Sequence, residues 1–144
     1  MPRKKPDDAA HRLADVAFFE GFTTDELDRV AALAEELDAE AGAELMDQGR
    51  PGQEAYVIVA GRAGVYVSGQ QIAELGPGEI VGEMALIDHR PRIAAVRALT
   101  DMTLLAFDAE RFRRLLDEMP KANLRVMEKL VQRLRNNDLD EAGS

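Results

Sequence analysis

Residues 76–98 constrain the fold most strongly, because glycine and proline breakpoints enclose short apolar runs there. Residues 79–81 are expected to form a short, largely buried strand that ends at Gly82, where the backbone must turn or approach something closely. Good helix formers occupy residues 83–86, so the free N–H groups at the start of that turn would point outward, where anions bind. Arg92 supplies a matching charge, since a guanidinium grips a phosphate bidentately. The stretch therefore predicts an anion site.

Glu83 is unusual beside such a site. A carboxylate near an anion is repulsive unless hydroxyl groups donate hydrogen bonds to it or a neighbouring arginine neutralises it. A ribose hydroxyl meets that need. A phosphate and a sugar hydroxyl together indicate a nucleotide, although the spacing does not say which one.

The run Gly-Glu-Met-Ala-Leu at 82–86, followed after four residues by Pro-Arg-Ile-Ala-Ala-Val at 91–96, resembles the phosphate-binding cassette of cyclic nucleotide-binding domains. The motif is specific because it is long and fixed in spacing. The resemblance implies that Glu83 binds the ribose 2′-hydroxyl and that Arg92 binds the cyclic phosphate. It also implies backbone contacts to the nucleotide from Gly82, Met84, Ala85, Ile93 and Ala94.

Ile93 departs from the family pattern, which usually has a small or hydroxylated residue after the cassette arginine. In the family a threonine there favours cyclic GMP by contacting guanine, and isoleucine offers no hydroxyl. Cyclic AMP (cAMP) is therefore expected as the ligand in preference to cyclic GMP (cGMP). The bulk of Ile93 also supports an alternative, in which the cassette is a fold element without ligand and the chain is an interaction scaffold.

Length and composition favour a single domain, because 144 residues provide one core of common size. The formal net charge of −9 is expected to repel nucleic acid and anionic membranes. No apolar run approaches the roughly 20 residues that span a bilayer, and no signal-peptide pattern opens the chain, so a cytoplasmic location is expected. The absence of cysteine excludes disulfides, thiol catalysis and the usual zinc sites, and no cofactor or metal is expected.

Enzymatic activity is not expected. Asp88 and His89 could in principle join Glu83 in acid–base chemistry. Adjacent loop residues have no fixed mutual geometry, however, and no third group orients the histidine.

Together with the strand and helix patterns below, the resemblance implies an α+β fold: an antiparallel β-roll (jelly-roll-like) flanked by N-terminal helices and C-terminal hinge and lid helices. A short helix is expected within residues 7–22, and a second starts at Thr23 or Thr24, with apolar residues at helical spacing as far as Leu37. Residues 11–137 are expected to form the domain, with disordered tails at 1–10 and 138–144.

Short segments punctuated by glycine predict the strands of the roll, with a tight turn at Ser68-Gly69. The expected strands are 44–46, 55–60, 63–67, 71–75, 79–81, 93–99 and 102–107.

Two helices are expected after the roll. Asp108 can cap a helix over 110–118, and Pro120 can start another that runs to about Asn136. The resemblance makes the last helix a lid over the base, with Arg133 as the candidate for stacking on adenine. This helix also carries an apolar stripe, which is expected to pack on the roll, with a dimer seam as the alternative: Leu124, Met127, Leu130, Val131 and Leu134.

The leading functional hypothesis is a sensor that binds a cyclic nucleotide and signals occupancy to a partner by rearranging its helices. The resemblance covers about residues 16–135, so the expected partner is an effector protein in trans, unless the domain belongs to a longer polypeptide. A monomer or a weak dimer through the C-terminal helix is expected.

Overall fold

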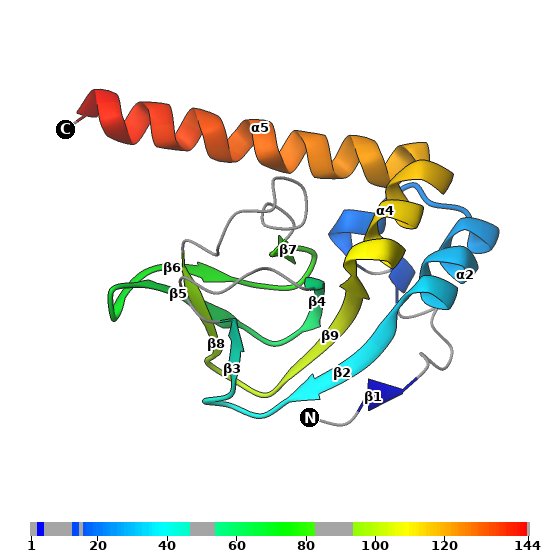
Figure 1. Ribbon diagram of the computed structural model, residues 1–144, viewed down its shortest axis with the longest axis horizontal. Helices are drawn as coiled ribbons and strands as arrows, with labels where there is room; N and C mark the ends of the chain where they lie inside the picture. Colours follow the sequence, from blue (N-terminus) through cyan, green and yellow to red (C-terminus); the bar gives the residue numbers. More distant parts are fainter. Residues whose placement is uncertain (1–2, 5–12, 15, 47–53, 83–93, 144) are drawn as a thin grey trace.

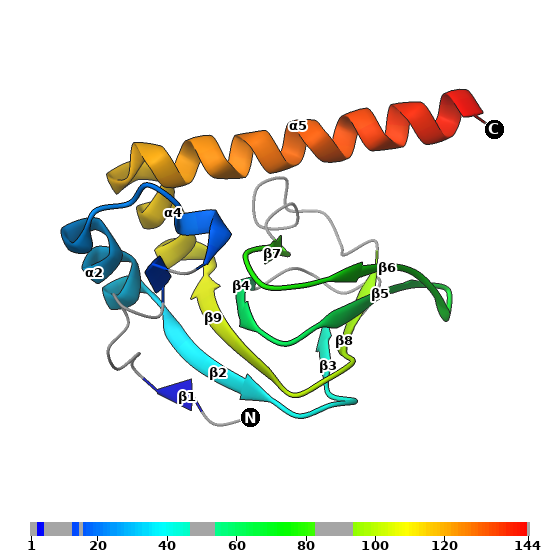
Figure 2. The ribbon, with the colours of Figure 1, turned by 180° about the vertical axis from the view of Figure 1, so that it is seen from behind.

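The computed structural model describes residues 3–4, 13–14, 16–46, 54–82 and 94–143. Two antiparallel sheets face each other as a β-roll, with helices packed at one end (Figure 1, and from behind in Figure 2). This arrangement confirms the predicted α+β class. The helices are the 3-10 helix η1 (Ala17–Phe19), which has no label in the figures, and the labelled α2 (Thr24–Leu33), α4 (Ala109–Glu118) and α5 (Pro120–Gly143).

Within the described residues, the larger sheet has five strands and the smaller sheet has four. The larger sheet runs in the order β1 (Arg3–Lys4), β2 (Glu35–Ala39), β9 (Met102–Asp108), β4 (Glu54–Ala60) and β7 (Ile80–Val81). The smaller sheet runs in the order β3 (Glu44–Met46), β8 (Ala95–Ala98), β5 (Ala63–Val67) and β6 (Gln70–Leu75).

Strand β4 of the larger sheet lies between β9 and β7 and is buried on both faces. Ala55 and Val57 join an apolar core beneath the helices, whereas Tyr56 and Ile58 join a second core inside the roll. Consecutive side chains of a strand point to opposite faces, so the apolar run of β4 reflects a sheet covered by helices on one side and by the roll on the other. Strand β9 divides its side chains between the two cores in the same way.

Helix α2 begins as predicted and ends earlier than predicted. The Thr23 hydroxyl accepts a hydrogen bond from the N–H of Glu26, and the Glu26 carboxylate accepts one from the N–H of Thr23, which forms a capping box. The helix ends at Leu33, and Leu37 lies on β2, paired with Leu104 of β9. The expectation of helical spacing as far as Leu37 was therefore wrong, because pairing with β9 outweighs the local pattern.

The predicted strands of the roll are confirmed to within two residues at each described end. Ser68 and Gly69 join β5 to β6 with positive φ angles of 52° and 81°. Positive φ at both central residues is typical of the type I′ turn of a two-residue hairpin, so the predicted tight turn is confirmed.

Helices α4 and α5 begin where they were expected. Asp108 caps α4, its carboxylate accepting a hydrogen bond of 2.8 Å from the N–H of Arg111. Helix α5 starts at Pro120 and continues to Gly143, beyond the end expected near Asn136. Two described elements therefore lie in segments expected to be tails: β1, which pairs with β2, and the end of α5.

The apolar stripe of α5 does not pack as predicted. Leu124 and Met127 are each 57% exposed, and Val131 is 47% exposed. The face that packs on the core instead carries Ala122 and Val126, with Leu130 half-buried against the same cluster. Ala122, Val126 and Leu130 are four residues apart, so they form the inward stripe of the helix. Of the predicted stripe, Leu130 therefore faces the core, whereas Leu124, Met127 and Val131 face solvent.

Candidate functional site

The predicted cassette is framed by described residues at its two ends. Val81 of β7 pairs with Tyr56 of β4 in the larger sheet, and Ala95 of β8 pairs with Tyr66 of β5 in the smaller sheet. The segment between them therefore connects one sheet of the roll to the other. Glu83, Met84, Ala85, Arg92 and Ile93 lie outside the described residues, so their predicted roles stay predictions.

The approach to the cassette is fixed by hydrogen bonds around β7. Ile58 donates its N–H to the carbonyl of Glu79 at 2.9 Å, and Gly78 donates to the carbonyl of Ile58 at 2.8 Å. The Glu79 carboxylate accepts a bond of 2.6 Å from the N–H of Gly76, which closes the turn before the strand. Glu79 thus holds the start of the site, a role that the sequence analysis did not assign.

Gly82 has a φ angle of 87°. This is the left-handed region, which costs glycine little and is strained for residues with a Cβ. The predicted turn after β7 is therefore present at Gly82.

Tyr56 and Glu54 place a polar pair beside the start of the cassette. The Tyr56 side chain is buried inside the roll, and its hydroxyl donates a 3.1 Å hydrogen bond to the Glu54 carboxylate. Because Tyr56 is the strand partner of Val81, this pair lies next to the point where the chain enters the cassette. The signal in the sequence was the spacing of two residues on a strand, which puts both side chains on one face.

The other end of the cassette enters β8. Ala94 and Ala95 are half-buried, and Val96 points into the roll. Arg97 is exposed, and its guanidinium lies 5.2 Å from the centre of the Tyr66 ring. Arg97 therefore stacks on the outside of the smaller sheet and is not available to an anion inside the roll.

The lid candidate Arg133 lies on α5, and its side chain lies outside the described residues. Helix α5 passes over the roll on the side of β7 in both ribbon views (Figures 1 and 2).

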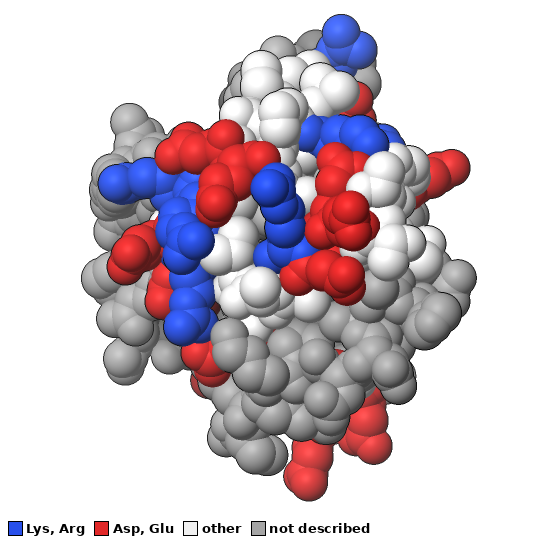
Figure 3. Space-filling view, turned by 90° about the vertical axis from the view of Figure 1, so that its right-hand side faces the viewer, with Lys and Arg blue, Asp and Glu red and all other residues white. Residues whose placement is uncertain are grey.

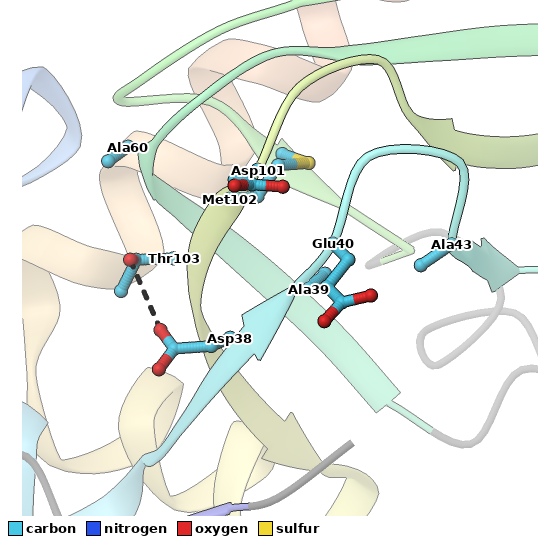
Figure 4. A pocket seen from close by; sticks show the side chains of 8 residues that line it. All are labelled: Asp38, Ala39, Glu40, Ala43, Ala60, Asp101, Met102 and Thr103. Carbon is cyan, nitrogen blue, oxygen red and sulfur yellow. Dashed lines mark hydrogen bonds between the residues drawn. The ribbon is translucent and has the colours of Figure 1, made fainter.

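A cavity of about 580 Å³ opens at the C-terminal end of β4, away from the start of the cassette (Figure 4). Ala60 lines it. Val81, the residue before Gly82, pairs with Tyr56, which lies four residues before Ala60 on β4 and therefore roughly 13 Å away along the strand. Three carboxylates lie at the cavity, from Asp38, Glu40 and Asp101. Such a lining repels phosphate, so this cavity is not the predicted anion site. Its full lining is Asp38, Ala39, Glu40, Ala43, Ala60, Asp101, Met102 and Thr103.

The described part of the chain holds no group of three or more histidine, aspartate or glutamate side chains arranged to bind a metal ion. None of its helices combines the length and apolar character needed to cross a bilayer.

Comparison with known proteins identifies relatives of this fold. The family model described as "Cyclic nucleotide-binding domain" matches residues 36–119. The chain is 33% identical over 108 residues to the Pycsar effector protein XpPycTIR of Xanthomonas perforans, covering 74% of this chain and 36% of that protein. It is 32% identical over 127 residues to the Cyclic AMP receptor protein of Thermus thermophilus, covering 85% of this chain and 59% of that protein.

Solved structures show the same relationship. The crystal structure of the Thermus thermophilus Catabolite Activator Protein aligns with a TM-score of 0.78 and 30% identity, covering 88% of this chain and 62% of that one. The chain thus spans less than two thirds of these relatives. The family match covers more than half of the chain and includes β2 to α4 with the whole cassette, so the chain belongs to the cyclic nucleotide-binding domain family.

Proposed function

We propose that this domain binds a cyclic nucleotide through residues 82–94 and signals its occupancy to an effector protein by repositioning α5. The observation that carries the proposal is the placement of the cassette. The strands that flank it belong to different sheets of the roll, with Val81 in the larger sheet and Ala95 in the smaller one, so ligand binding between them would pull on both sheets.

Within this proposal each cassette residue has a chemical role. Arg92 pairs with the cyclic phosphate, and Glu83 accepts a hydrogen bond from the ribose 2′-hydroxyl. The turn at Gly82 has a positive φ. The backbone N–H groups of Gly82, Met84 and Ala85 contribute to the anion cradle. Ile93 and Ala94 complete it, and Arg133 of α5 stacks on the base.

Cyclic AMP is the proposed ligand, with cGMP second. Ile93 has no hydroxyl to contact guanine. The Thermus thermophilus relative is named as a receptor for cAMP, which supports the same preference.

The output is proposed to pass through α5. A ligand shifts a conformational equilibrium only by its difference in affinity for the two states, so the nucleotide must favour one position of this helix. The exposed stripe of Leu124, Met127 and Val131 gives α5 an apolar face for a second copy or for the effector. We favour a monomer that dimerises weakly through this stripe, in the cytoplasm, with no catalytic activity and no binding to nucleic acid or membrane.

The second candidate function is a scaffold that keeps the fold without a nucleotide. The exposed stripe of α5 favours it, because a docking face does not depend on the cassette.

Isothermal titration of the nucleotide-free protein distinguishes the two functions. Saturable binding of cAMP, tighter than binding of cGMP in a parallel titration, is the expected result. No heat of binding with either nucleotide would contradict the sensor and favour the scaffold.

A further inference from the structure

Strand β2 carries a row of acidic side chains. Glu36 and Asp38 of the strand, and Glu40 just after it, are two residues apart and lie on one face, whereas Leu37 and Ala39 point into the core of the roll. Glu36 is 3% exposed and is the only buried charged residue in the described part of the chain. A carboxylate buried this deeply requires a cationic or hydrogen-bonding partner. The row therefore favours positive charge beside β2.

The acids around this row differ in how they are neutralised. Glu35, at the start of β2, pairs with Arg111 of α4 at 3.0 Å. Asp38 accepts a 3.3 Å hydrogen bond from the Thr103 hydroxyl, but neither Asp38 nor Glu40 has an ion pair among the described residues. Figure 3 faces the end of the molecule that carries α2 and shows basic and acidic side chains interleaved, whereas the side chains coloured at its lower edge are acidic. The acidic row thus keeps negative charge that no described cation matches.

A basic segment of the same chain lies against this strand. Strand β1 pairs with β2 in antiparallel fashion, with Arg3 opposite Leu37 and Lys4 opposite Glu36, and it is the outermost strand of the larger sheet. Both ribbon views show β1 beside β2 on the side of the molecule away from α5 (Figures 1 and 2). Residues directly opposite each other in such a pair carry their side chains on one face, where opposite charges are stabilising. The register therefore brings a lysine position to the buried Glu36.

We propose that the outer edge of β2 is a strand-addition site for an extended basic segment, and that residues 2–5 of this chain are its occupant. Backbone pairing supplies the affinity of such a site, and the acidic row supplies its selectivity. Lys4 neutralises Glu36, and the neighbouring Arg3 and Lys5 add positive charge to the segment. The occupant also closes a sheet edge that would otherwise be open to pairing with another chain.

Two observations favour this occupant over other segments. Residues 3–5 are the only three consecutive basic residues in a chain whose formal net charge is −9. Two of these three residues are the ones that the structure pairs with β2. The basic N-terminal segment is thus an intramolecular ligand of the acidic strand, and this role does not depend on nucleotide binding.

Tryptic cleavage of the nucleotide-free protein, followed by intact-mass spectrometry, tests the proposal. Trypsin cuts after Arg3 and Lys4 only when the segment leaves β2, because a protease acts on the opened chain. We expect both bonds to be cut at least about tenfold more slowly than in the free peptide of residues 1–8.

Glu36→Gln should raise the rate of this cleavage about two- to tenfold, because it removes the charge opposite Lys4. Glu110→Gln is the matched control, since Glu110 is exposed on α4 and has no ion pair among the described residues. Cleavage after Arg29 of α2 measures global unfolding in the same digest and should not change. Asp38 is exposed, so Asp38→Asn repeats the test in a variant that is expected to fold.

A second experiment supplies the segment in trans. Lys4→Glu combined with Lys5→Glu in the whole chain repels the resident segment from the acidic row. A fluorescently labelled peptide of residues 1–8 should bind this variant at least tenfold more tightly than it binds the wild type, whose site is filled, as measured by fluorescence anisotropy. The same peptide with both lysines replaced by glutamate is the control and should bind neither protein.

Several results would overturn the proposal. Cleavage as fast as in the free peptide, equal cleavage of the Glu36→Gln and Glu110→Gln variants, or no binding of the peptide to the charge-reversed variant would each rule out the site. Equally tight peptide binding to the wild type, or a wild-type dimer that the charge-reversed variant loses, would rule out residues 2–5 of the same chain as the occupant.

Discussion

The Lys121 ammonium lies 2.8 Å from a carboxylate oxygen of Glu26, across a gap of 95 residues in the sequence. The hydrogen bond from Lys121, followed by the bond from the N–H of Thr23, lowers the pKa of Glu26 from 4.5 to about 2. Glu26 is therefore ionised in the folded protein near neutral pH, and its negative charge strengthens both bonds.

The depressed pKa of Glu26 predicts a specific acid sensitivity. The folded state binds this proton less readily than the unfolded state, so its contribution to stability is complete above pH 4.5 and is lost as the pH falls toward 2. Glu26→Gln should reduce the loss of unfolding free energy between pH 6 and pH 3, measured by urea denaturation. Glu20→Gln removes an exposed carboxylate nearby and should leave that loss unchanged. Equal pH dependence in Glu26→Gln and the wild type would contradict the prediction.

The Tyr56 hydroxyl beside the cassette is expected to stabilise the folded protein more than the Tyr66 hydroxyl at the surface does. Tyr56→Phe removes a 3.1 Å hydrogen bond to a carboxylate inside the roll and should lower the free energy of unfolding by about 1–3 kcal/mol. Tyr66→Phe removes a 3.3 Å bond to Gln71 at the surface and should cost less than about 0.5 kcal/mol. Urea denaturation of both variants measures the contrast, and equal costs would show that the Tyr56 hydroxyl is not stabilising the roll.

Local signals in the sequence were sufficient to predict much of the fold. The Ser68-Gly69 turn and the cap at Asp108 act within a few residues, so their chemistry is readable from the sequence. Leu37 was misplaced because its strand is defined by Leu104, far away in the chain. The spacing that made Leu37 look helical could not reveal this partner.

Helix α5 shows a different limit of prediction from the sequence. It carries two apolar stripes that share Leu130, and the sequence analysis grouped Leu130 with the larger side chains. The core accepts the stripe with Ala122 because a small residue allows the helix to approach the phenylalanine cluster of η1 closely. For the site, the resemblance supplied the roles of the cassette residues, whereas the pairing of Tyr56 with Glu54 required the structure.

Removal of the cassette arginine is expected to abolish most of the nucleotide affinity. Arg92→Ala should weaken cAMP binding by about 2–5 kcal/mol, the scale for deleting one partner of a buried charged pair. Arg97→Ala is the control, because Arg97 stacks on Tyr66 outside the roll. Titration calorimetry of both variants measures the difference. An Arg92→Ala variant that binds cAMP as the wild type does would rule out the proposed phosphate site.

The residue after that arginine is expected to set nucleotide preference. Ile93→Thr introduces a hydroxyl that can contact guanine, and one added hydrogen bond is worth about 0.5–1.5 kcal/mol. The ratio of cGMP to cAMP affinity should therefore rise about two- to tenfold. Competition with a fluorescent cyclic nucleotide measures the ratio in the variant and the wild type. A ratio that stays constant would show that position 93 does not contact the base.

The solvent-exposed stripe of α5 predicts how the domain associates. Met127 is 57% exposed and lies between Leu124 and Val131, so a charge placed there would be buried if two copies met along this face. Met127→Glu should weaken self-association at least tenfold in sedimentation equilibrium, and it should leave the urea midpoint nearly unchanged because the side chain is not in the core. Gln132→Glu adds the same charge on an exposed position outside the stripe and should associate as the wild type does. If both variants associate equally, the stripe is not the seam, and the effector becomes its proposed occupant.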